Sequence, residues 1–166
     1  MTIPIIIVNW KGLQDTIECV NSLLLSSHTD FHIFLIDNFS NDGSIETLQN
    51  LFGNHPKITL IENSSNLGFT GAHIEILHQL LDQDYPYIAL LNNDTSVESD
   101  WLSNLIRCAR ETGADMVSSK MIYYFDRTLM DNAGHKILNT GEILPVGHKE
   151  PVEKFTKRFE NIGPCA

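Results

Sequence analysis

The chain has 166 residues, the size of one domain, and hydrophobic residues make up 42% of it, enough to form a packed core. Its formal net charge of −10 argues against nucleic acid or an anionic membrane as the main partner. The three cysteines, Cys19, Cys108 and Cys165, show no zinc-ligand spacing and indicate free thiols in a reducing compartment. The N-terminal apolar run is too short for a signal peptide or a membrane span, so we expect a cytoplasmic protein.

Apolar, β-branched runs alternate with helical patterns along the first two thirds of the chain. The runs predict strands over residues 3–8, 31–36, 58–61 and 87–91. Apolar residues at helical spacing predict helices over 13–24, over 44–51, from near Gly71 to 81, and over 102–109 before Gly113. This alternation predicts an α/β fold, a mostly parallel sheet with helices on both faces. After Gly113 the pattern weakens to short strands at 116–117 and 121–124 and a turn-rich stretch over 126–166.

Polar residues follow each predicted strand. They are Asn9-Trp10, Asp37-Asn38, Glu62-Asn63 and Asn92-Asn93-Asp94-Thr95. In open α/β sheets, ligands bind beyond the carboxyl ends of the strands, so these residues are candidate ligand contacts. Asn and Asp also favour turns and helix caps, which is the alternative interpretation for any one of them. We single out Asp37 and Asp94 because both follow central-looking strands.

Common phosphate and nucleophile motifs are absent. The sequence NWKGLQD after the first strand has one glycine and is no dinucleotide fingerprint, and neither GxxxxGK[ST] nor GxSxG occurs. The segment 66–71 places two glycines before a predicted helix, where backbone N–H groups can meet a diphosphate at the positive end of the helix dipole. Two glycines in a loop are, however, more often only a turn.

Four blocks in order resemble the nucleotide-sugar domain of glycosyltransferase family 2, nearest to its rhamnosyltransferase-like branch: IIIVNWKGLQDTIECVNSLL, FLIDNFSNDGS, NSSNLGFTGAH and YIALLNNDTSVESDWL. The resemblance covers about residues 3–118. It implies a Rossmann-like GT-A fold, a nucleotide diphosphate-sugar donor and inversion at the anomeric carbon. It also implies the donor-binding positions, namely Asn9 at the first strand end, Asp37 as base-recognition aspartate, Asn66, Gly68 and Gly71 beside the donor, Asn92 in the metal motif, and Asp94 as its metal-binding acid.

The sequence departs from the family pattern at two places. Asn93 stands where this branch has a proline, and Asn92 stands where the DxD motif has its first acid. After Gly71 the family continues with Gly-Asn-Asn, whereas here Ala72-His73 follow. We interpret His73 as a surface helix residue rather than a donor contact. Trp10 can stack on a base, but packing under a helix is the favoured interpretation.

The chemistry of the two carboxylates agrees with the implied roles. Asp37 can accept a hydrogen bond from the imide N–H of uracil or thymine, and equally from guanine, so the donor is dTDP-, UDP- or GDP-linked. Asp94 suits Mg²⁺ or Mn²⁺, which prefer oxygen ligands and can complete their shell with diphosphate oxygens. The metal would offset charge on the leaving diphosphate.

The sequence therefore predicts a donor-binding core over 1–118 and the incomplete start of an acceptor-side region over 119–166, within a single domain. We expect sugar transfer to a glycan or lipid-linked saccharide in bacterial surface polysaccharide synthesis, at the inner membrane face. No acid matches the family's general base, so we expect that base beyond Ala166, a fragment inactive alone, and self-association through an unpaired sheet edge. The alternatives are a non-catalytic nucleotide- or sugar-binding module and, third, a nucleotidyltransferase.

Overall fold

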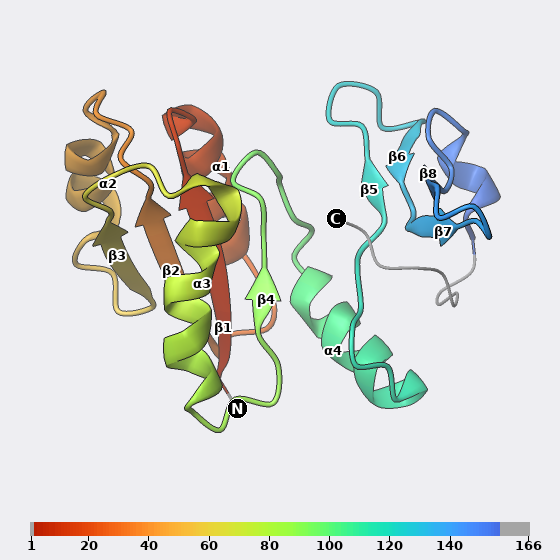
Figure 1. Ribbon diagram of the computed structural model, residues 1–166, viewed down its shortest axis with the longest axis horizontal. Coiled ribbons are helices and arrows are strands. Elements are labelled where there is room, and N and C mark those ends of the chain that lie inside the picture. Colours follow the sequence, from red (N-terminus) through yellow and green to blue (C-terminus); the bar gives the residue numbers. More distant parts are fainter. Residues whose placement is uncertain (1, 157–166) are drawn as a thin grey trace. The chain divides into compact units, whose positions relative to one another are not determined.

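The computed structural model describes residues 2–156, which belong to two compact units, the first ending at Asp100 and the second beginning at Trp101 (Figure 1). The expected division after residue 118 stays a prediction. The first unit alternates strands and helices along the chain: β1 (Ile3–Asn9), α1 (Leu13–Leu24), β2 (Phe31–Asp37), α2 (Ser44–Phe52), β3 (Ile58–Glu62), α3 (Gly68–Leu81) and β4 (Ala89–Leu90).

The four strands form one parallel sheet in the order β3-β2-β1-β4, which confirms the predicted α/β fold. β1 and β2 pair along their whole lengths, and the last pair is Asn9 opposite Asp37. On the other side of β2, Asp37 stands opposite Glu62 of β3. The parallel register therefore brings the terminal residues of three strands side by side at the carboxyl edge of the sheet.

Helices cover both faces of this sheet. α3 lies across one face, and α1 lies on the other (Figure 1). On the α3 side, Ile6 and Ile36 of the central strands pack with Ile76 and Leu80. Side chains alternate along a strand, so the buried Ile5 of β1 faces the opposite way, toward the α1 layer. The strands are therefore largely apolar on both faces, and besides the polar residues at their carboxyl ends they carry His32 and Thr59, whose side chains lie 2.8 Å apart.

Several predicted elements differ in the structure, among them the strand expected at 121–124, which covers only Met121–Ile122. β4 is only two residues long, although the Leu91 N–H still donates to the Ile6 carbonyl at 3.0 Å. α3 begins at Gly68 rather than near Gly71, because Gly68 takes φ +68° and turns the chain into the helix. The strand expected at 116–117 does not form, and that stretch is irregular.

As far as residue 156, the second unit contains one α-helix and short antiparallel strands. α4 (Trp101–Thr112) ends before Gly113, as expected, and the indole N–H of Trp101 donates to Ser119 Oγ at 3.1 Å. Two strand pairs follow: β5 (Met121–Ile122) with β6 (Met130–Asn132), and β7 (His135–Ile137) with β8 (Ile143–Pro145). A 3-10 turn, η1, covers Val152–Lys154. Within residues 2–156, no helix is both long and apolar enough to cross a membrane.

Candidate functional site

A buried polar group joins the ends of β1 and β2. The Asn9 side-chain N–H donates to Asp37 Oδ1 at 2.6 Å and to Ser40 Oγ at 3.1 Å. Ser40 donates twice to Asp37, from its hydroxyl to Oδ1 at 2.6 Å and from its backbone N–H to Oδ2 at 3.0 Å. All three side chains are at most 1% exposed. The Asp37 carboxylate is therefore held rigidly by three donors, as a buried charge requires.

The same group extends to α1 and to the segment after β4. Asn9 Oδ1 accepts from the Thr16 hydroxyl at 2.9 Å and from the Gly12 N–H at 3.2 Å. The Asn93 side-chain N–H donates in turn to Thr16 Oγ1 at 2.9 Å. A continuous chain of hydrogen bonds thus runs from Asn93 through Thr16 and Asn9 to Asp37.

A second polar group fastens the start of α3 to the end of β2. The side-chain oxygen of Asn38, Oδ1, accepts from Asn63 Nδ2 at 2.9 Å and from the Leu67 N–H at 3.1 Å. Asn38 Nδ2 donates to Asn66 Oδ1 at 3.0 Å, and that oxygen also accepts from the Gly68 N–H at 2.8 Å. Asn66 and Gly68, both predicted from the sequence, are therefore hydrogen-bonded to each other, and Asn38 connects them to the end of β2.

Gly71 lies in the first turn of α3. A Cβ there would meet Leu67 Cβ at 3.0 Å, so the glycine permits close packing of that turn.

Asp94 lies on an exposed segment that is tied to α1. The Asn92 carbonyl accepts from Cys19 Sγ at 3.5 Å and from the Thr95 hydroxyl at 2.7 Å. Burial raises the pKa of the Cys19 thiol to about 11, so it stays protonated and can donate. The side chains of Asn92 and Asp94 themselves are exposed.

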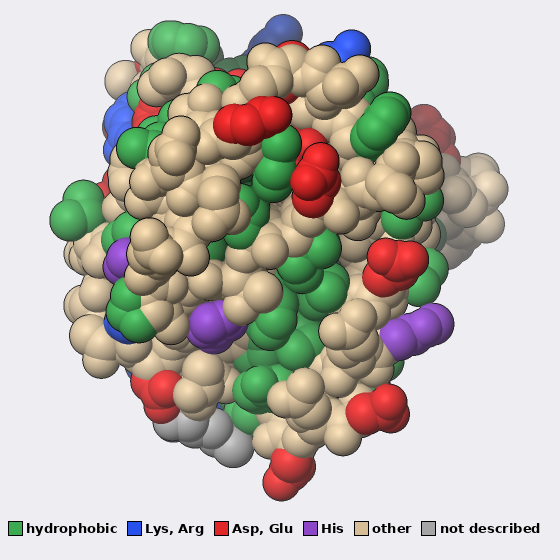
Figure 2. All heavy atoms as spheres, turned by 90° about the vertical axis from the view of Figure 1, so that its left-hand side faces the viewer, with side chains coloured by type: hydrophobic (Ala, Val, Ile, Leu, Met, Phe, Trp, Pro, Cys, Tyr) green, Lys and Arg blue, Asp and Glu red, His purple; other side chains and the backbone are tan. Residues whose placement is uncertain are grey.

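A pocket of about 210 Å³ opens beside Asp37. Its lining is acidic and carries one aromatic ring: Asp37, Phe39, Asn41, Asp42, Gly43, Ile45, Glu46 and Glu62. Pockets for whole drug-sized ligands are roughly 300–1,000 Å³, so this one suits part of a nucleotide. Acidic side chains outnumber basic ones on the molecular face that carries α2 and β3 (Figure 2). The pocket lining offers acceptors for N–H groups and no cation for a phosphate.

The donor set for a metal consists of one exposed carboxylate, that of Asp94. Among residues 2–156, no three His, Cys, Asp or Glu side chains come together as a metal-binding cluster. An exposed carboxylate on a fastened segment nevertheless fits Mg²⁺ or Mn²⁺, provided that ligand oxygens supply the remaining coordination. The residues present therefore fit a metal that binds together with a diphosphate, and not one held by the protein alone.

Two interpretations from the sequence are wrong. His73 is not on the surface: it is 4% exposed, its Nδ1 bonds to the Phe69 carbonyl oxygen at 2.7 Å, and its ring lies 4.4 Å from the Phe69 ring. Trp10 does not pack under a helix: it is 53% exposed, with the Lys11 ammonium 5.3 Å from its ring. Helical spacing alone could not tell which side of α3 the sheet covers.

Sequence reasoning missed Ser40 and Thr16. Ser40 carries a local signal, because serine three residues after an aspartate is typical of a turn in which the carboxylate accepts from the serine. Thr16 carries no such signal, because its bond to the Gly12 carbonyl is an ordinary helical one, while Asn9 and Asn93 lie 7 and 77 residues away in the chain. Only the packing of α1 against the sheet brings them together.

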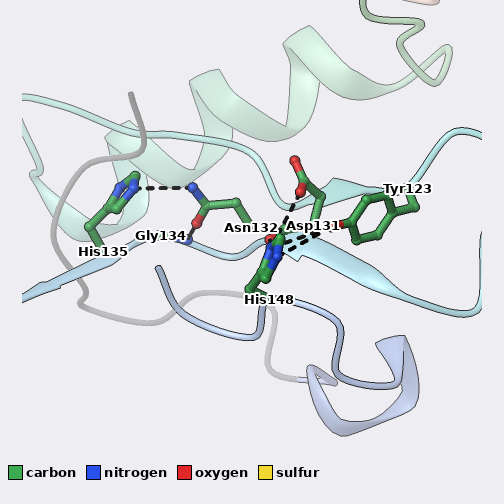
Figure 3. A network of polar contacts seen from close by, with 6 residues as sticks. All are labelled: Tyr123, Asp131, Asn132, Gly134, His135 and His148. Carbon is green, nitrogen blue, oxygen red and sulfur yellow. Dashed lines mark hydrogen bonds and ion pairs between the residues drawn. The ribbon is translucent and has the colours of Figure 1, made fainter. Parts of the chain in front are cut away.

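The second unit contains a separate polar cluster (Figure 3). His148 Nδ1 lies 3.6 Å from Asp131 Oδ1 and 3.2 Å from the Asp131 carbonyl oxygen. The Tyr123 hydroxyl is 3.4 Å from either ring nitrogen. Desolvation, and next the Asp131 charge, raise the pKa of Tyr123. Beside it, Asn132 accepts from the Gly134 N–H at 2.7 Å and contacts His135 Nε2 at 3.3 Å.

Comparisons with known proteins give one family and one fold. The model of the family described as Glycosyl transferase family 2 matches residues 5–166, while no curated protein matches the chain. S. aureus TarS 1–349 matches with a TM-score of 0.63 and 16% identity, over 86% of this chain and 43% of that one. The structure of the same protein in complex with UDP-GlcNAc matches with a TM-score of 0.63 and 16% identity, over 84% of this chain and 41% of that one.

A further solved structure is the mannosyltransferase PcManGT from Pyrobaculum calidifontis in complex with GDP-Man and Mn²⁺. It matches with a TM-score of 0.60 and 15% identity, over 85% of this chain and 43% of that one. At these identities the likeness concerns the fold. The chain spans about two fifths of the length of these proteins.

Proposed function

The chain belongs to glycosyl transferase family 2, and on that premise we propose that it carries the donor-binding part of an enzyme that transfers a sugar from a nucleotide diphosphate-sugar. The observation that carries this proposal is the Asp37 carboxylate, held by Asn9 and Ser40 in the wall of the acidic pocket. The fold neighbours in complex with UDP-GlcNAc and with GDP-Man support this class of ligand.

The base of the nucleotide occupies the pocket beside Asp37 in this proposal. A carboxylate in the wall can accept from an N–H of uracil, thymine or guanine, and the exposed Phe39 ring offers a flat apolar surface. The proposed donor is therefore dTDP-, UDP- or GDP-linked. Four carboxylates in the lining disfavour phosphates there, so the diphosphate extends away from the pocket.

The diphosphate end of the donor is assigned to the segment that carries Asp94. Its exposed carboxylate would hold Mg²⁺ or Mn²⁺ together with diphosphate oxygens. When bound, the metal offsets the charge that develops on the leaving diphosphate. Asp37, which Asn9 holds, orients the base in this proposal. The hydrogen bonds from α1 to the segment after β4 keep Asp94 in place.

The finer assignments follow the family pattern. The proposed reaction inverts the anomeric carbon and uses a saccharide or lipid-linked saccharide acceptor of bacterial surface polysaccharide synthesis, at the cytoplasmic face of the membrane. Association of copies through the sheet edge belongs to the same proposal.

A thermal-shift panel of UDP, dTDP and GDP, each with and without Mn²⁺, tests the proposal. Ligand-linked stabilisation follows RT ln(1 + [L]/Kd), about 2.7 kcal/mol at a hundredfold excess over Kd. We expect one nucleotide to stabilise the chain, and more strongly with Mn²⁺. No stabilisation by any of the three would refute donor binding.

Two substitutions divide the site into its base and diphosphate ends. Asp37→Asn preserves the side-chain shape and should weaken nucleotide binding about tenfold or more, since a hydrogen bond to a charged acceptor is worth about 1.5–3 kcal/mol, while pyrophosphate binding barely changes. Asp94→Ala should abolish the Mn²⁺ enhancement. Asp84→Asn, at an exposed position, is the matched control. Equal losses for nucleotide and pyrophosphate in Asp37→Asn would contradict the base assignment.

A second candidate function is a non-catalytic nucleotide-binding module. The amides of Asn92 and Asn93, which stand where the family has an acid and a proline, favour it. Such a module would be stabilised by a nucleotide to the same extent with and without Mn²⁺.

A further inference from the structure

Three side chains on one face of α1 hold the segment that follows β4. Thr16 accepts from Asn93 Nδ2 at 2.9 Å, Cys19 donates to the Asn92 carbonyl at 3.5 Å, and Ser22 Oγ accepts from the Val97 N–H at 3.1 Å. Spaced three residues apart, these side chains share one face of the helix. The segment that carries Asp94 is thus fastened on both sides of that residue, while the Asp94 side chain stays exposed.

Thr16 differs from the other two because it also reaches the base-facing end of the site. Its hydroxyl is fully buried and lies 2.9 Å from Asn9 Oδ1, and Asn9 in turn donates to Asp37 Oδ1 at 2.6 Å. The one hydrogen of this hydroxyl has two acceptors at 2.9 Å, Asn9 Oδ1 and the Gly12 carbonyl oxygen, and its lone pairs can accept from Asn93 at the same time. When the hydrogen points to Asn9, the bonds from Asn93 through Thr16 and Asn9 to Asp37 are aligned, and aligned bonds reinforce one another.

The structure also explains why residue 12 is a glycine. A Cβ on Gly12 would lie 2.7 Å from Asn93 Nδ2, closer than real Cβ contacts allow. The φ angle of Gly12, −111°, is one that other residues adopt readily, so its conformation does not require glycine. The absent side chain leaves room for the Asn93 amide to reach Thr16.

We propose that Thr16 is a positioning residue that sets the separation between the base-facing carboxylate, Asp37, and the metal-facing carboxylate, Asp94. It touches neither ligand end itself and acts through Asn9 on one side and Asn93 on the other. This inference rests on the proposed function, because it concerns a ligand that spans both carboxylates. The affinity of a ligand that reaches only one of the two carboxylates does not depend on the distance between Asp37 and Asp94.

The test compares Thr16→Val, which removes the hydroxyl at constant shape, with Thr16→Ser, which restores it. The probes are UDP, dTDP and GDP with and without Mn²⁺, the corresponding nucleosides, and pyrophosphate with Mn²⁺, each titrated by calorimetry. Thr112→Val is the matched control, since the Thr112 hydroxyl bonds to the carbonyl four residues before it, that of Cys108, at 2.7 Å, as the Thr16 hydroxyl does to the Gly12 carbonyl at 2.9 Å.

We expect Thr16→Val to weaken the diphosphate nucleotide with Mn²⁺ by about threefold to tenfold, the equivalent of one neutral hydrogen bond. Nucleoside and pyrophosphate affinities should change less than twofold, and Thr16→Ser should restore the wild-type value. A purely structural role would weaken all ligands together, or none, and either result overturns the proposal.

Asn93→Ala provides a second variant at a partly exposed position, in case Thr16→Val does not fold. It should show the same selective loss, and the double variant Thr16→Val, Asn93→Ala should lose no more than either single variant. Wild-type affinity for the diphosphate nucleotide in Asn93→Ala overturns the positioning role. If the wild-type chain binds none of the three nucleotides, the proposed function itself fails.

Discussion

The substitution Asn9→Asp tests the buried polar group directly, because it places a second carboxyl 2.6 Å from Asp37 Oδ1. At that distance two charges repel by about 6 kcal/mol for an effective dielectric constant near 20. Retaining one proton at pH 7 costs less, about 4 kcal/mol, given an ordinary aspartate pKa near 3.9. The folded variant should therefore bind one proton more than its unfolded chain.

The sign of the pH dependence follows from that proton. Stability falls as pH rises wherever the folded state binds more protons, so the penalty is small near pH 4 and grows by about 1.4 kcal/mol per pH unit above it. By pH 7 the loss of about 4 kcal/mol is a large part of the 5–15 kcal/mol that stabilises typical domains.

Urea unfolding followed by circular dichroism at several pH values between 4.5 and 7.5 measures this difference. Asn54→Asp, at an exposed position, adds the same charge without a buried partner and is the control. We expect the stability difference between Asn9→Asp and the control to widen steadily with pH. A difference that does not change with pH would refute the close contact between residues 9 and 37.

Two further predictions concern the α1 face. Gly12→Ala should destabilise the chain by about 1 kcal/mol, the worth of the displaced Asn93–Thr16 hydrogen bond, in urea unfolding. In a chain that already carries Asn93→Ala, the Gly12→Ala substitution should leave the free energy of unfolding unchanged. An equal loss of stability with and without Asn93→Ala would contradict a clash between the new Cβ and Asn93. With Cys108 and Cys165 replaced by alanine, the remaining Cys19 thiol should react slowly with a thiol reagent at pH 8 until urea is added, because burial raises its pKa to about 11. Rapid reaction of the native chain would place Cys19 at the surface.

The order of elements in the first unit could be predicted from the sequence because it depends on local patterns. Apolar runs such as residues 3–8 form strands that are covered on both faces, and segments with apolar residues at helical spacing, such as 13–24, form the helices that cover them. The four sequence blocks likewise predicted the family, which the match over residues 5–166 confirms. Since parallel strands end at one edge, the sequence also indicated that Asn9 and Asp37 lie together, as their hydrogen bond confirms.

The remaining features depend on contacts between residues far apart in the chain, which no local pattern encodes. His73 lies inside rather than outside because the orientation of α3 on the sheet decides which of its faces is covered. The acidic pocket forms only when the loop after β2 meets the end of β3. Thr16 is an ordinary helical residue by sequence, and it joins Asn9 to Asn93 only because α1 packs between β1 and the segment after β4. In the first unit the sequence by itself thus determined the strands and the polar residues at their ends, while the tertiary structure decided which side chains connect them, since hydrogen bonds depend on distances that only packing sets.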